Sequence, residues 1–129
     1  MMRVGRYAMA LGWLAAVVIL IGCGAGQDRP DPNLPAEAQQ GWHAYRALGC
    51  GSCHGDQLEG KRSGPALTGI TDHWHEETLV TYLKDPAAMI KTTPRLAYRA
   101  EQYPIAMPGF VEKADDATLA QISAYLLAY

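Results

Sequence analysis

The segment Cys50-Gly51-Ser52-Cys53-His54 places two thiols and an imidazole within five residues. Two cysteines at this spacing, followed directly by a histidine, are typical of the attachment site of a c-type haem. The thiols can form thioethers to the two vinyl groups on one edge of the porphyrin, and this places the imidazole beside the iron. We therefore predict that Cys50 and Cys53 bind one haem covalently and that His54 is an axial ligand.

A second axial ligand must come from elsewhere in the chain. Met107 is favoured because it lies in a segment pinned by Pro108 and is far enough along the chain to reach the other face of the haem. The alternative is that Met107 only fills a gap in the core, since methionine is an adaptable packing residue. The other candidates, for which we expect packing, surface or capping roles, are Met89, His43, His73 and His75.

Apolar side chains at helical spacing predict three helices. No run alternates with period two for long enough to form a strand, so the predicted fold class is all-α. Before the last helix, Pro104 and Pro108 bracket an extended segment that leads to Met107. The predicted helices cover about residues 36–48, about residues 75–84, and a last segment that begins near Asp115 or Asp116.

Residues 1–22 have the features of an export signal. Arg3 and Arg6 give a positive start, and the apolar run that follows is short for a membrane span, which needs about 20 residues. Its end, Leu20-Ile21-Gly22-Cys23, resembles the lipobox of bacterial lipoproteins. The resemblance implies that Cys23 becomes the lipidated first residue of the mature chain; the alternative is an uncleaved anchor helix with an incidental cysteine.

This leader predicts an extracytoplasmic protein that is lipid-anchored to a bacterial membrane, on its periplasmic face. Residues 23–35, rich in proline and glycine, form a flexible tether after the lipidated cysteine. A proline-rich tether extends about 3 Å per residue. The predicted folded domain then covers residues 36–129.

Four motifs in order make this domain resemble the class I, mono-haem cytochromes c. No motif except the haem-attachment segment is rare, but the ordered set is highly specific. The motifs are Gly41 and Tyr45 followed by Gly49-Cys50-Gly51-Ser52-Cys53-His54-Gly55; Gly64-Pro65-Ala66-Leu67; Tyr103-Pro104 leading to Met107-Pro108-Gly109-Phe110; and a last helix with Ile122, Tyr125 and Leu126.

The resemblance implies a cytochrome c fold of three to five helices around one covalently bound haem. It implies that the first and last helices cross closely at Gly41, with Tyr45 near Ile122 and Tyr125. It also implies that the Pro65 carbonyl accepts a hydrogen bond from His54. With His54 and Met107 as axial ligands, no site stays open for oxygen or peroxide, so we expect an electron carrier and not an enzyme.

Composition is consistent with one small redox domain. The chain has 129 residues with 11 basic and 13 acidic side chains, and it lacks the basic surplus of a nucleic-acid-binding protein. Losing Arg3 and Arg6 with the leader would make it more acidic. The basic residues Lys84, Lys91, Arg95 and Arg99 precede Met107 and could steer an acidic redox partner, or be ordinary solvated surface.

The expected redox partners are oxidases, dehydrogenases or respiratory complexes. The protein is also expected to contact the membrane, through the lipid on Cys23. Several aromatic side chains are expected to line or cover the haem, or simply to pack: Trp42, Trp74, Tyr82, Tyr98, Tyr103 and Phe110.

Three other functions compete with the carrier. A thiol–disulfide oxidoreductase using Cys50 and Cys53 would need a preceding strand and a βαβ pattern. A zinc site would need histidines at a spacing that His73 and His75 do not have. A haem sensor or peroxidase-like subunit would need a displaceable distal ligand.

Overall fold

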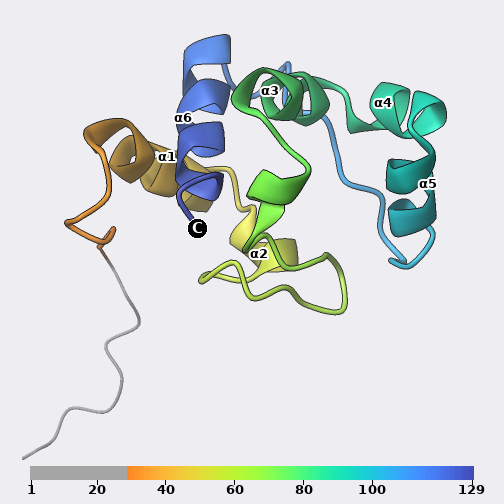
Figure 1. The fold of residues 1–129 in the computed structure, drawn as a ribbon, viewed down its shortest axis with the longest axis horizontal. Helices are drawn as coiled ribbons and strands as arrows, with labels where there is room; N and C mark the ends of the chain where they lie inside the picture. The colour runs from red at the N-terminus through yellow and green to blue at the C-terminus, as the bar shows by residue number, and fades with distance from the viewer. Residues whose placement is uncertain (1–28) are drawn as a thin grey trace, which may run out of the picture.

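The computed structural model describes residues 29–129, all of whose regular elements are helices (Figure 1). The predicted leader, Cys23 and the first part of the tether, up to residue 28, lie outside the described residues. No helix among residues 29–129 is long and apolar enough to span a bilayer. The elements are α1 (Ala36–Ala47), α2 (Gly51–His54), the 3₁₀-helix η1 (Ile70–Asp72), α3 (Glu76–Lys84), α4 (Pro86–Thr92), α5 (Pro94–Ala100) and α6 (Asp116–Leu126).

The all-α prediction is confirmed, and the three helices predicted by apolar spacing correspond to α1, α3 and α6. The described residues contain more helices than the three to five implied by the resemblance. The extra ones are short: the haem-attachment motif itself forms the single turn α2, and α4 and α5 have seven residues each. Pro86 ends α3, as predicted, but it also opens α4 as its first residue, where a missing N–H costs nothing.

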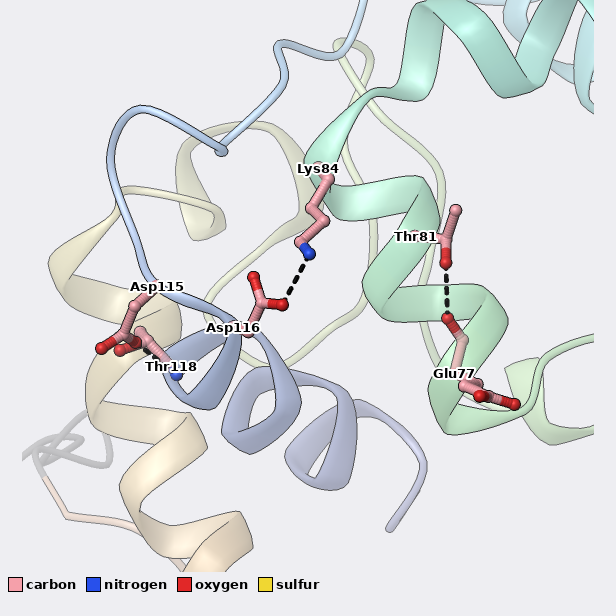
Figure 2. Close-up of polar contacts among 6 residues, drawn as sticks. All are labelled: Glu77, Thr81, Lys84, Asp115, Asp116 and Thr118. Carbon is pink, nitrogen blue, oxygen red and sulfur yellow. Dashed lines mark hydrogen bonds and ion pairs between the residues drawn. The ribbon is translucent and has the colours of Figure 1, made fainter.

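Side-chain caps fix the ends of the helices around the site. The Asp85 carboxylate accepts the Ala88 N–H at 2.9 Å and begins α4. The Asp115 carboxylate accepts the Thr118 N–H at 2.8 Å and begins α6, as the sequence predicted (Figure 2). Because these caps satisfy N–H groups that the first helical turn leaves free, they define where each helix starts.

The crossing of α1 and α6 forms the centre of the core (Figure 1). A Cβ atom at Gly41 would collide with the main-chain carbonyl oxygen of Gln121, so only glycine allows this approach. The rings of Tyr45 and Tyr125 meet edge to face with centroids 5.5 Å apart. The predicted crossing at Gly41 is confirmed.

Helix α3 packs across α6 and is also bridged to it at the surface. The Lys84 ammonium lies 2.7 Å from the Asp116 carboxylate, as Figure 2 shows. This ion pair within the chain joins the end of α3 to the start of α6. Helices α4 and α5 lie away from the α1–α6 crossing and pack on each other, and α4 also packs on α3 (Figure 1).

Candidate functional site

A cavity of about 750 Å³ opens between α2, α3, α5 and the loop before α6. Its walls include all five residues that the sequence assigned to the haem site within the described chain. These are Cys50, Cys53, His54, Pro65 and Met107.

The His54 imidazole is held in one orientation. Its side chain is 8% exposed, and its Nδ1 lies 2.8 Å from the Pro65 carbonyl oxygen. Because a carbonyl oxygen only accepts, Nδ1 carries the hydrogen and Nε2 keeps its lone pair. Burial lowers the pKa of His54, while the Pro65 carbonyl acts in the opposite direction. The lowered pKa favours the neutral ring, which is hydrogen-bonded on one nitrogen and can bind a metal with the other, as ligating histidines do.

Cys50 and Cys53 lie on the same turn as His54 and are half-buried free thiols. Burial raises the pKa of the Cys50 thiol to about 11 in the unmodified chain. A thiol with a raised pKa forms little thiolate at neutral pH and is a poor nucleophile for disulfide exchange. No strand precedes the motif within residues 29–129. Both observations argue against a thiol–disulfide oxidoreductase.

Two of the five candidates for the second axial ligand line the cavity, Met107 and His73. Met107 is half-buried and packs on the hydrophobic core, whereas His73 is exposed. Met89 and His43 lie outside the cavity lining, and His75 caps α3. Met107 therefore remains the favoured candidate.

The loop that carries Met107 is anchored on the end of α3. The Phe110 N–H donates to the Leu83 carbonyl at 3.0 Å. Gly109 approaches the Lys84 carbonyl so closely that a Cβ atom there would lie 2.5 Å from its oxygen. The place of Met107 on the cavity wall thus depends on a glycine two residues further along the chain.

Every formally charged side chain lining the cavity is basic: Arg95, Arg99 and Lys113, with no aspartate or glutamate among the described lining residues. The Arg95 guanidinium lies 5.2 Å from the centre of the Trp74 ring, and Trp74 packs on Tyr82 at 5.0 Å. Burial raises the pKa of Tyr82, while the Arg95 charge lowers it in part. This wall is suited to an anion.

The side-chain N–H and O–H groups of Arg95, Trp74 and Tyr82 have no hydrogen-bond partner among residues 29–129. They therefore leave a guanidinium, an indole N–H and a phenol O–H free on one wall. The sequence identified the three residues individually, but only the fold brings them together. Lys113 on the cavity wall was missed because nothing in its sequence context distinguishes it from other surface lysines.

Of the six aromatic side chains expected to line the haem site or to pack, four line the cavity and Trp42 packs in the core. Trp74, Tyr82, Tyr103 and Phe110 line the cavity. Trp42 instead packs beside His43 under the Arg46 guanidinium, and Tyr98 is 68% exposed. Trp42 therefore follows the packing alternative, since helical periodicity cannot tell which buried face meets the cavity and which meets another helix. Tyr98 was misplaced because α5 was not recognised.

The cavity fits a covalently bound haem. Its volume lies in the range of small-molecule and cofactor sites, about 300–1,000 Å³. It offers two thiols for the vinyl groups, an oriented imidazole for the iron and basic donors for the two carboxylates. By contrast, residues 29–129 hold no cluster of three or more histidine, cysteine, aspartate or glutamate side chains able to bind a bare metal ion. The zinc alternative therefore lacks ligands.

The family model of cytochrome c matches residues 38–129. The chain belongs to the cytochrome c family. Neither a curated protein nor a solved structure matches it significantly. As a small single-domain cytochrome c it binds one covalent c-type haem and acts in haem-based electron transfer.

Proposed function

We propose that this cytochrome c is a class I, mono-haem electron carrier with His54 and Met107 as axial ligands. The observation that carries the proposal is that Met107 lines the same cavity as Cys50, Cys53 and His54. When bound, the haem supplies a one-electron iron couple. Thioether ligation favours the ferrous form and raises the reduction potential. With two protein ligands on the iron, substrates have no open position, which favours a carrier over an enzyme.

The protein's own residues have three tasks in this proposal. The Pro65 carbonyl fixes the orientation of His54. Apolar walls formed by core side chains exclude water from the site, and the free donors of Arg95 and its neighbours bind the haem carboxylates. These hydrogen bonds would be strong, since bonds with an ionised donor or acceptor are roughly twice as strong as neutral ones.

The test of axial ligation is Met107→Ala in the holoprotein. We expect the sulfur-to-iron absorption band near the red end of the ferric spectrum to disappear, and the potential to fall by more than about 100 mV, within the roughly 0.8 V range that axial ligands set. The ferrous variant should bind carbon monoxide at neutral pH.

Met89→Ala is the matched control, because Met89 is half-buried but lies outside the cavity lining. It should keep the band, the potential and the resistance to carbon monoxide. If the band survives in Met107→Ala, Met107 is not the ligand. If the unaltered ferrous protein binds carbon monoxide, the haem is that of a sensor or peroxidase-like protein.

We further propose that the protein is a lipoprotein tethered to the extracytoplasmic face of a bacterial membrane. The support is the sequence of the leader, with its basic start and the lipobox-like segment before Cys23. Haem attachment in bacteria follows export, which is consistent with this location. The domain would then serve an oxidase, a dehydrogenase or a respiratory complex at the membrane surface.

A further inference from the structure

The Lys61 side chain reaches back to the haem-attachment turn. Its ammonium donates to the Gly51 carbonyl oxygen at 2.8 Å. Gly51 lies between the two cysteines and opens α2, so this contact touches the turn that carries both thiols and His54. The neighbouring Arg62 has no such contact: it makes no hydrogen bond or ion pair within residues 29–129.

The main chain of Lys61 is also held by hydrogen bonds. Its N–H donates to the Gly64 carbonyl at 2.9 Å, and the Gly64 N–H donates back at 3.2 Å. These bonds close a tight turn over residues 61–64. The ammonium is therefore held by a rigid turn and not by a freely moving loop.

The same tight turn supports the His54 imidazole. A Cβ atom at Gly64 would lie 2.9 Å from the Cys53 carbonyl oxygen and 3.2 Å from Cε1 of His54, so the turn packs directly on the ring. The next residue, Pro65, accepts the hydrogen bond from Nδ1. The Lys61 ammonium thus joins the attachment turn to the segment that orients the imidazole.

The position of the ammonium is also favourable for α2 itself. The carbonyls of a single helical turn have few partners of their own, and the Gly51 carbonyl accepts only the Gly55 N–H at 3.0 Å from the main chain. A hydrogen bond from a charged donor is also stronger than one from a neutral donor. The bond therefore supplies a second partner to a carbonyl of the turn that holds the haem.

We propose that Lys61 is a positioning residue for His54 and that it raises the reduction potential of the haem. This inference rests on the proposed ligation by His54. By joining the two segments, Lys61 keeps the Pro65 carbonyl in place and so sets the hydrogen bond that tunes the axial ligand. Its positive charge beside the attachment turn also favours the ferrous state, which carries one positive charge less than the ferric state.

The test compares Lys61→Met, Lys61→Arg and Arg62→Met in the holoprotein. Spectroelectrochemistry gives the potential, and NMR gives the exchange rate of the His54 Nδ1 proton with water. We expect Lys61→Met to lower the potential and to speed this exchange several-fold. Lys61→Arg, which keeps a charged donor, should largely restore both values. Arg62→Met removes the same charge from the next residue and should leave the exchange rate unchanged.

Equal effects of Lys61→Met and Arg62→Met on both readouts would overturn the inference, because they would reduce Lys61 to one surface charge among others. Lys61→Gln serves if the methionine variant loses haem during maturation, since it removes the charge with a smaller change in polarity. Failure of the proposed ligation is visible separately: the unaltered protein would then lack the spectrum of an iron with histidine and methionine ligands.

Discussion

The buried side chain of Tyr45 stabilises the haem-attachment segment through a hydrogen bond. It is 1% exposed, and its hydroxyl donates to the Gly55 carbonyl at 2.7 Å, directly after His54. Burial raises the pKa of Tyr45 strongly, so the hydroxyl keeps its proton and remains a donor. The residue that packs the α1–α6 crossing therefore also holds the end of α2.

Tyr45→Phe should destabilise the holoprotein by about 1–3 kcal/mol, because it leaves the buried Gly55 carbonyl with only the long 3.4 Å bond from the Leu58 N–H. Urea unfolding followed by circular dichroism measures this difference. Ser123→Ala is the control: Ser123 is fully buried in α6, and its hydroxyl has no partner among the described residues. Its loss should leave stability unchanged or slightly raised. A Tyr45→Phe variant as stable as the unaltered protein would show that the bond to Gly55 contributes nothing.

At the level of elements, the domain depends on how closely α1 and α6 approach. The close contact lies at Gly41, where the Gln121 main chain and the Tyr125 Cβ occupy the space that a side chain would need. The Gln121 carbonyl is backbone of α6, and the Tyr125 Cβ is bonded directly to that backbone, so neither can move independently of the helix. The helices would have to separate to accommodate any larger residue.

Gly41→Val should therefore lower the free energy of unfolding of the holoprotein by at least about 1–3 kcal/mol, as is typical of overpacked cores. Its thermal midpoint should fall sharply as a result. Differential scanning calorimetry gives the midpoint. Ala47→Val places the same side chain at an exposed position of the same helix and controls for the lower helix propensity of valine. An unchanged midpoint in Gly41→Val would mean that the helices do not cross at this residue.

Elements with strong apolar periodicity were predictable, and short ones were not. The helices α1, α3 and α6 have apolar residues at regular spacing, and α6 also has a clear cap in Asp115. Helix α5 has seven residues, of which only Leu96 is buried, so no period could show it. The segment between Pro104 and Pro108 was expected to be extended; it begins with bends and then has no regular structure.

The residues that attach the haem and orient His54 were easier to predict from the sequence than the residues that line the cavity walls. The attachment motif and Pro65 have fixed sequence spacing, because the haem and the imidazole impose it. The walls are assembled from positions far apart in the chain, and their roles depend on tertiary packing. This is why Arg95 next to Trp74, and Lys61 on Gly51, emerge only from the structure.

The whole molecule is acidic, yet its cavity is lined by basic side chains. The formal charge of the full chain is −2, whereas the charged residues lining the cavity are Arg95, Arg99 and Lys113. Of the four basic residues expected near the methionine loop, Arg95 and Arg99 line the cavity, Lys84 pairs with Asp116, and Lys91 is exposed on α4. This asymmetry favours an acidic redox partner at the cavity mouth.

The reaction rates of small charged redox reagents can distinguish the effect of the basic residues at the cavity from the effect of the net acidic charge of the protein. Oxidation of the ferrous protein by anionic hexacyanoferrate should slow as ionic strength rises, because salt screens an attraction to the basic rim over about 10 Å. Oxidation by a cationic cobalt complex should show the opposite trend. Lys113→Gln, at an exposed residue of the cavity wall, should weaken the salt dependence more than Arg29→Gln in the tether. If the hexacyanoferrate reaction instead speeds up with salt, the net acidic charge controls the encounter, and the basic rim has no steering role.

The most direct test of this account is the intact mass of the mature protein, purified from the membranes of a cell that matures c-type cytochromes. The account predicts a chain that begins at Cys23 and carries lipid, together with the mass of one haem that survives denaturation because Cys50 and Cys53 hold it. A mass equal to the polypeptide and lipid alone, with both thiols free, would contradict the central claim.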